Sequence, residues 1–210
     1  MLRGGGWGNF VYESGSWDYS FHVPHDLNAL IEACGGSKAV EIRLDTFFSG
    51  GYFTIGNEPG FLVPCYYNYI AKQHKTSKLI RGIMANNFSD SRGGLPGNDD
   101  AGTTSAWYIF HSLGFYPNAG QDVYLIAAPH YEKITIHLEN GKTFVIMAEN
   151  VSDQNIYIQK AILNGKPLNK NWFRHTDTKN GGTLKFYMGS KPSDWSANGN
   201  PPPSMSTECE

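Results

Sequence analysis

The chain has 210 residues, and its 17 Lys and Arg nearly balance its 19 Asp and Glu, giving a net charge of −2. This balance argues against a dedicated nucleic-acid binder, which would carry a basic patch or stripe. No apolar run approaches the length of a membrane span, and three widely spaced cysteines give neither a disulfide framework nor a CxxC metal motif.

Four helix signals, joined by long loops, occupy residues 20–115. The clearest covers residues 26–34, where Asp26 can cap the helix and Gly35 can end it. A second candidate, "NEPGFLVPCYYNYIAK", contains Pro64, which is unfavourable inside a helix. Two more helices are expected over residues 76–88, with Thr76 as a possible cap, and over residues 103–114, ending at Gly114.

The apolar period changes to two after residue 120, which predicts strands. Asn140-Gly141 predicts a hairpin with a two-residue type I′ turn, and Asn164-Gly165 repeats the signal. Residues 181–189 supply another strand. The cross-strand pairs expected around the first turn are Leu138 with Thr143, Ile136 with Val145 and Ile134 with Met147.

These patterns divide the chain into three parts. Residues 1–120 form a helical part, residues 121–192 an antiparallel β part, and residues 193–210 a tail rich in Pro, Ser and Gly that is expected to be disordered. The fold class is therefore α+β.

Three acidic loops each lead into a helix signal. Glu13 lies in "YESGSWDYSFHVPHD", Asn57 and Glu58 lie in "GNEPG", and Asp99 and Asp100 lie in "GLPGNDDAG". Each has a plain interpretation, either as a solvated surface group or as a helix cap. Glycine and proline on both sides of the Asp pair favour a shaped loop over simple capping.

If the helices stand side by side, their loops meet at one rim, and two carboxyl groups there can act as acid and base. Glycoside hydrolases use such a pair of carboxyl groups as their catalytic residues. The seven histidines show no metal-binding spacing, and His25, in "PHD", is more simply explained as orienting the following helix.

Four motifs in order resemble the C-terminal part of glycoside hydrolase family 92. They are "YESGSWDYSFHVPHD", "GNEPGFLVPCYYNYIAK", "GLPGNDDAGTTSAWYIFHSLGFYP" and "ITIHLENGKTF", and the resemblance runs from about residue 10 to about residue 192. The family contains calcium-dependent, inverting exo-α-mannosidases, common in Bacteroidetes. The resemblance implies the C-terminal part of an (α/α)6 barrel, residues 1–120, followed by antiparallel β-sandwich strands.

The resemblance also assigns roles to individual residues. It implies that Glu13 is the general acid and Asp100 the general base, with Asn98 and Asp99 supporting Asp100. A second Asp often stands where this chain has Asn98. Calcium is the implied cofactor, bound by Asn57, Glu58 and Asp100, and the implied substrate-binding residues are Trp17, His25 and Asn57. Ile55-Gly56 replaces the His-Glu pair of α-1,2-specific members, so no linkage preference follows.

The implied partners are a mannose-containing glycan, such as an N-glycan or mannan, and an N-terminal part of the parent chain that is missing here. The resemblance carries the expectation of a periplasmic or secreted parent, although the first residues contain no apolar signal-peptide core. Two alternatives remain open: an incomplete, non-catalytic carbohydrate-binding or structural fragment, and a calcium-stabilised scaffold.

Overall fold

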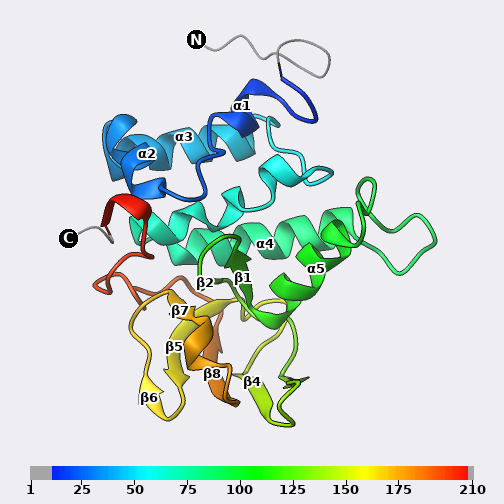
Figure 1. The fold of residues 1–210 in the computed structure, drawn as a ribbon, viewed down its shortest axis with the longest axis vertical. Helices are drawn as coiled ribbons and strands as arrows, with labels where there is room; N and C mark the ends of the chain where they lie inside the picture. Colours follow the sequence, from blue (N-terminus) through cyan, green and yellow to red (C-terminus); the bar gives the residue numbers. More distant parts are fainter. Residues whose placement is uncertain (1–10, 208–210) are drawn as a thin grey trace.

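The computed structural model describes residues 11–207 of the chain. Helices fill the upper part of Figure 1 and strands the lower part. The α-helices are α1 (Ser16–Tyr19), α2 (Leu27–Ala33), α3 (Ser37–Ser49), α4 (Gln73–Asn87) and α5 (Thr103–Leu113). The 3₁₀ helices are η1 (Glu58–Gly60), η2 (Val63–Ile70), η3 (His175–Asp177) and η4 (Met205–Thr207).

Helix α2 has the ends that the sequence predicts. The Asp26 carboxylate accepts a hydrogen bond from the N–H of Ala29 at 3.2 Å, and Gly35 takes a φ of 94° just after the last turn. Both signals are local, because an N-cap oxygen and a left-handed residue act within one turn of the helix.

The second candidate helix is not α-helical. Its residues form η1 and η2, and Pro64 lies in the first turn of η2. A proline lacks the N–H that an α-helix needs and crowds the carbonyl four residues earlier, which explains the interruption.

The third helix, α4, begins at Gln73, three residues before the predicted cap. Thr76 therefore lies inside the helix, and its hydroxyl donates to Asn68 Oδ1 at 2.8 Å instead of capping. Helix α3 was not predicted at all, although Val40, Leu44 and Phe47 recur on one buried face.

The strands form two sheets. The first is antiparallel, in the order β1 (Phe115–Asn118), β2 (Val123–Ile126), β7 (Trp172–Arg174). The second has the order β3 (Lys133–His137), β4 (Thr143–Glu149), β8 (Gly182–Gly189), β5 (Tyr157–Leu163), β6 (Lys166–Pro167). It is mixed, because β4 and β8 run parallel whereas the other neighbours are antiparallel. Strand structure begins at Phe115, slightly before the expected boundary.

The first hairpin exists, but its predicted turn and register are wrong. Strand β3 pairs with β4 so that Ile136 opposes Phe144 and Ile134 opposes Ile146. The N–H of Gly141 donates to Leu138 O at 3.0 Å and Gly141 has a φ of 77°, which describes a three-residue loop ending in a left-handed glycine.

The error arises because β4 is apolar at four successive positions, residues 144–147, so either register pairs apolar side chains. The second predicted turn is a two-residue loop. Asn164 and Gly165 both have positive φ, and Leu163 pairs with Lys166 across them. Positive φ at both central residues is the signature of the type I′ turn.

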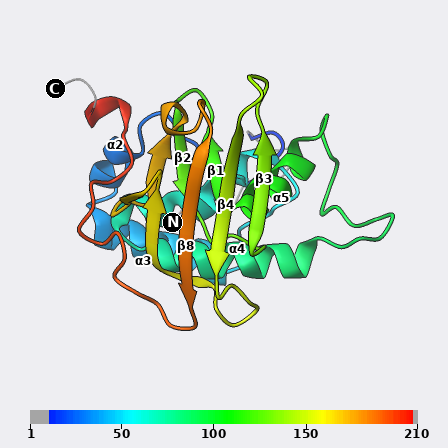
Figure 2. The same cartoon turned by 90° about the horizontal axis from the view of Figure 1, so that it is seen from below.

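The molecule has three layers. Figure 2 shows the five-stranded sheet in front, with α3 and α4 behind it. Strand β2, in the sheet between them, alternates sides. Leu125 packs with the helical core around Leu44 and Phe47, whereas Ile126 packs with Phe144 and the rest of the five-stranded sheet. Strand β2 therefore contacts the helical layer with one face and the five-stranded sheet with the other.

A buried polar network joins the layers at Asn68 of η2, which is 1% exposed. Its amide Nδ2 donates to Ile126 O at 2.9 Å and to Asn171 O at 3.1 Å, and its Oδ1 accepts from Thr76. Asn171 Nδ2 returns a bond to Asn68 O at 2.9 Å. Each group would cost free energy if buried unpaired, so the network fixes how η2 meets the strands.

The C-terminal segment, residues 193–207, packs on the body and differs from the expected disordered tail. Trp195 Nε1 donates to Leu168 O at 2.8 Å, and Trp172 Nε1 donates to Asn200 O at 2.9 Å. Ser206 Oγ donates a hydrogen bond to Oδ1 of Asp26, the N-cap of α2, at 2.7 Å. The hydrogen bonds of the two indole rings and of the Ser206 hydroxyl hold this segment in place, although its composition alone predicts disorder. Residues 208–210 lie outside the described residues.

The five α-helices within residues 11–207 do not close a barrel, so the (α/α)6 architecture stays a prediction about the complete domain. Over the same residues, none of the helices has the length and apolar character needed to cross a lipid bilayer.

Candidate functional site

The turn that carries Glu13 is tied to the Asn57 segment. Asn57 Nδ2 donates a hydrogen bond to the backbone carbonyl of Glu13. Glu13 itself has a φ of 64°, a left-handed conformation that costs a residue with a side chain about 1–2 kcal/mol. Surrounding contacts must hold such a residue in place, and strain of this kind often accompanies a functional group.

The Asn57 segment touches the loop that carries the Asp pair. A Cβ atom built on Gly97 would lie 2.7 Å from Gly56 O, and one built on Gly56 would lie 3.1 Å from Pro96 O. The two backbones therefore meet where neither residue has a side chain. The three acidic loops are thus linked in one chain of contacts, from Glu13 through Asn57 and Gly56 to Gly97.

Asp100 lies in a strained turn before α5. Asp100, Ala101 and Gly102 all have positive φ, at 46°, 59° and 97°. The Thr103 hydroxyl donates to Asp100 O at 2.7 Å, and Asn98 Nδ2 donates to Asp100 Oδ1 at 2.8 Å. Asn98 thus orients the Asp100 carboxylate directly.

Asp99 makes only local contacts with the helix start. Its Oδ1 accepts from the N–H of Ser105 at 2.8 Å, and its Oδ2 accepts from the Ser105 hydroxyl at 3.0 Å. Each carboxylate oxygen therefore holds a donor of α5, and the negative charge lies at the positive end of the helix. These contacts fit the supporting role expected for Asp99.

Asn57, Glu58 and Asp100 carry the oxygen atoms that calcium prefers, on loops that touch. Within residues 11–207, however, no three His, Cys, Asp or Glu side chains are grouped so that they could hold a metal ion. The donor chemistry fits calcium, but the described acidic groups do not complete a site.

Trp17 and His25, the other expected substrate-binding residues, differ in their surroundings. The Trp17 ring stacks on Tyr52 with centroids 4.6 Å apart, and the Arg43 guanidinium lies 4.7 Å from its centroid. These contacts favour packing over sugar stacking. His25 is exposed at the start of α2, and its carbonyl accepts from the N–H of Met205 at 3.0 Å. Their roles in sugar binding remain predictions.

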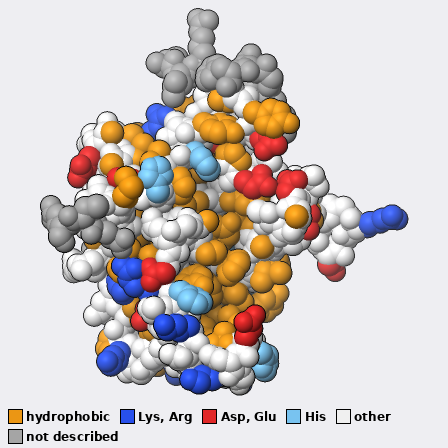
Figure 3. Space-filling model, viewed as in Figure 1, with side chains coloured by type: hydrophobic (Ala, Val, Ile, Leu, Met, Phe, Trp, Pro, Cys, Tyr) orange, Lys and Arg blue, Asp and Glu red, His pale blue; other side chains and the backbone are white. Residues whose placement is uncertain are grey.

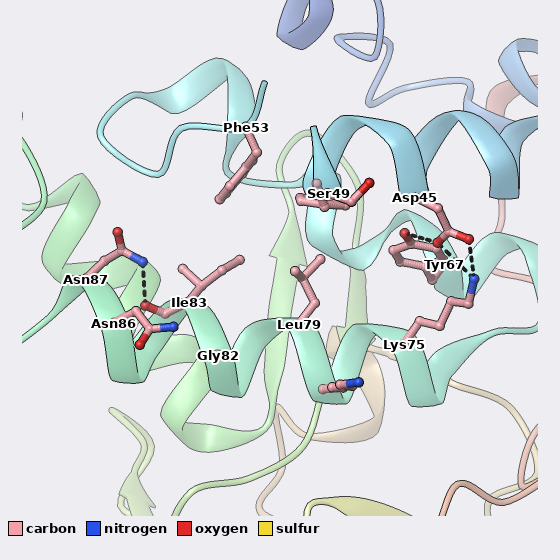
Figure 4. A pocket seen from close by; sticks show the side chains of 12 residues that line it. Asp45, Ser49, Phe53, Tyr67, Lys75, Leu79, Gly82, Ile83, Asn86 and Asn87 are labelled. Carbon is pink, nitrogen blue, oxygen red and sulfur yellow. Dashed lines mark hydrogen bonds and ion pairs between the residues drawn. The ribbon is translucent and has the colours of Figure 1, made fainter. Parts of the chain in front are cut away.

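A large groove lies away from the acidic loops. This groove of about 640 Å³ runs between α3 and α4, with Phe53, Leu79 and Ile83 along it and an ion pair of Asp45 with Lys75 at one end (Figure 4). Neither Glu13 nor Asp100 lines it. Its apolar walls contrast with the polar groups that bind sugars, so it is not the candidate active site.

Charge is scattered over the face seen in Figure 3. Lys, Arg, Asp and Glu side chains lie apart around a central apolar band, and this face shows no broad basic patch. The distribution agrees with the near-neutral net charge of the sequence.

Sequence reasoning missed two buried titratable groups on the helices that follow the acidic loops. Asp18 of α1 is 1% exposed, and His111 of α5 is fully buried. Burial raises the pKa of Asp18 and lowers the pKa of His111 to about 3. A carboxylate in "SWDY" and a histidine in "IFHSL" look like ordinary helix residues, so only their burial distinguishes them.

His111 makes stability depend on pH. Its ring lies 4.2 Å from Trp107 and 4.7 Å from Tyr116, centroid to centroid, and neither ring nitrogen has a hydrogen-bond partner among the described residues. Because its folded pKa of about 3 lies below the unfolded value of 6.5, the unfolded chain binds more protons between these values. Unfolding free energy should therefore fall as pH falls through this window, by about 1.4 kcal/mol per pH unit.

The expected result is that His111→Phe removes this component while keeping an aromatic ring between its neighbours. Denaturant unfolding of both proteins at several pH values between 6 and 4 measures the two slopes. His74 and His130, whose pKa values burial also lowers, contribute equally to both proteins. Equal slopes for wild type and variant would show that His111 does not carry the effect.

The family model of the glycosyl hydrolase family 92 catalytic domain matches residues 3–190. A protein of Arthroderma benhamiae, described as an uncharacterized secreted glycosidase, is 39% identical over 199 residues, which make up 93% of this chain and 26% of that protein.

Solved structures agree. A family GH92 alpha-mannosidase from Bacteroides thetaiotaomicron, in complex with mannoimidazole, is 33% identical with a TM-score of 0.89, over 93% of this chain and 28% of that one. An inverting family GH92 mannosidase from Bacteroides thetaiotaomicron VPI-5482 is 32% identical with a TM-score of 0.85, over 95% and 31%. The chain thus spans between a quarter and a third of the length of these relatives. A match that takes in nearly every residue of the chain confirms the resemblance, and the chain belongs to glycosyl hydrolase family 92.

Proposed function

We propose that this chain supplies the acid and base of an enzyme that removes terminal α-linked mannose from glycans with inversion. The observation that carries the proposal is the linkage of three acidic loops, through the bond from Asn57 to Glu13 and the contact between Gly56 and Gly97. The similarity to two mannosidases supports mannose as the sugar.

In the proposed reaction, Glu13 donates its proton to the glycosidic oxygen as the bond to the sugar carbon breaks. Asp100 takes a proton from a water that attacks the same carbon from the opposite face, so the product is mannose of inverted configuration. Asn98 binds Asp100 Oδ1 and leaves Oδ2 for the water. Inversion requires the two carboxyl groups to stand roughly 6.5–9.5 Å apart, with room for the water.

Calcium enters the proposal as a cofactor of the complete enzyme. Asn57, Glu58 and Asp100 would contribute oxygen ligands, and further ligands would come from outside the groups that residues 11–207 bring together. A bound calcium ion would supply positive charge and open positions for sugar hydroxyls. The proton transfers by Glu13 and Asp100 are assigned without it.

The proposal places the parent protein outside the cytoplasm, in the periplasm or the medium, supported by the description of the fungal relative as secreted. A second candidate function, an incomplete fragment that binds sugar or only packs, is favoured by one observation: the chain covers 31% or less of each of these relatives.

An assay of the complete domain distinguishes the two. We expect it to cleave an aryl α-mannoside, and NMR spectra taken early in the reaction should show the β-anomer of mannose first. The 210-residue chain is assayed alongside. The α-anomer as first product would overturn inversion. Mannose binding without turnover by the 210-residue chain would favour the non-catalytic alternative.

A further inference from the structure

Asp18, the third residue of α1, is a buried carboxylate with one unpaired oxygen. It is 1% exposed, and burial raises its pKa because a charge is costly away from water. Its Oδ2 accepts from the N–H of Gly15 at 3.3 Å, whereas its Oδ1 has no hydrogen-bond partner among the described residues. The bond to the N–H of Gly15, the N-cap of α1, stabilises the helix start and offsets part of this cost.

The carboxylate lies between two of the three segments that carry acidic candidates. On one side it holds Gly15, two residues after Glu13. On the other it faces Gly60, where a built Cβ atom would lie 3.4 Å from Asp18 Oδ1 and 2.7 Å from Thr54 O. Gly60 closes η1, which begins at Glu58. Asp18 therefore fills the junction between the Glu13 turn and η1.

The Glu13 turn needs external support, because its central residue has a φ of 64°. Three contacts supply it, one of them the hydrogen bond from the Tyr19 hydroxyl to the carbonyl of Tyr12. Asn57 Nδ2 binds the carbonyl of Glu13 itself, and Asp18 Oδ2 binds the N–H of Gly15 on the far side of the turn. With both ends of the turn held, the direction in which the Glu13 side chain leaves the backbone is fixed.

We propose that Asp18 is a positioning residue for Glu13: by holding the N–H of Gly15 and packing against Gly60, it aims the Glu13 carboxyl at the departing glycosidic oxygen. This assignment rests on the proposed function, in which Glu13 is the general acid. Asp18 touches neither the substrate nor the reacting atoms in this role. It acts through the backbone of the turn.

The role has a kinetic signature, because a misplaced general acid matters only when the leaving group needs a proton. In the complete domain, Asp18→Ala should lower kcat on an unactivated mannose disaccharide by about 10²-fold with little change in KM. On 2,4-dinitrophenyl α-mannoside, whose leaving group departs without protonation, the loss should stay within about threefold. Asp18→Asn, which keeps an oxygen acceptor for Gly15, should recover most of the lost rate.

The ratio of kcat/KM on the two substrates is independent of how much of a variant is folded, so it separates positioning from stability. Asp18→Glu, which keeps the charge but moves the carboxylate, should shift the ratio in the same direction as Asp18→Ala. The control is Asp177→Ala in η3, where Oδ2 accepts from the N–H of Arg174 at 2.9 Å in the same three-residue arrangement. It should leave the ratio unchanged.

Equal losses on both substrates for Asp18→Ala would overturn the positioning role and leave Asp18 a structural residue. So would an Asp18→Asn variant as selectively impaired as Asp18→Ala. A wild-type complete domain that cleaves neither substrate would instead overturn the proposed function, and the Asp18 assignment with it.

Discussion

Asp100→Asn and Glu13→Gln are each expected to lower turnover of the complete domain by about 10²–10⁴-fold, because each removes a proton transfer from the transition state. Asparagine at residue 100 still accepts the hydrogen bond from Asn98, so the loop stays in place while the base is lost. Steady-state kinetics on an aryl α-mannoside and on an unactivated disaccharide measure the effect.

The two variants should differ in one respect. A good aryl leaving group should partly rescue Glu13→Gln, because little protonation is then needed, but it should not rescue Asp100→Asn, because water must still be activated. The control is Asp99→Asn, which keeps oxygen for the N–H of Ser105 and should cost much less. Wild-type turnover in Asp100→Asn would refute the assignment of the base.

Asn68→Ala is expected to lower the free energy of unfolding by about 3–5 kcal/mol, the largest stability effect we predict. The substitution leaves the buried Thr76 hydroxyl without its acceptor and removes one of two donors from each of two buried carbonyls. Ile126 O keeps only the longer bond from Gln73 Nε2, and Asn171 O keeps the bond from the N–H of Ile126. Denaturant unfolding of the two otherwise identical chains measures the change.

The matched control is Asn87→Ala at the end of α4. Its amide also donates to a backbone carbonyl, that of Ile83 at 2.9 Å, but the residue is exposed, so water replaces the lost bond. We expect a change within about 0.5 kcal/mol there. Similar losses of unfolding free energy for Asn68→Ala and Asn87→Ala would show that the buried network around Asn68 adds no special stability.

The sequence predicted the elements whose signals are local. The ends of α2, with Asp26 and Gly35, needed only one turn of context. Helix α3 escaped because the two glycines before it suggested a stop, although Val40, Leu44 and Phe47 carried its period. The register of β3 on β4 could not be derived, because both faces of β4 are apolar and the turn type alone decides it.

In the candidate site, too, local features could be predicted and long-range contacts could not. The residue types and their loops were visible in the sequence, and the family resemblance gave them roles. Their meeting depends on long-range contacts, such as Gly56 against Gly97, which no local pattern reports. Asp18 was missed because burial, and not residue type, sets it apart from other acids in short helices.

The return of the C-terminal segment to α2 has a consequence for the order in which the chain can fold. Ser204 meets Asn28, and Ser206 meets Asp26, across 176 and 180 residues of sequence. During synthesis α2 leaves the ribosome well before the hydroxyls that complete its first turn. Contacts this distant in sequence form late and slow folding. A stop codon at residue 204 would therefore remove hydrogen bonds from the first turn of α2 and leave every strand of the two sheets in the chain.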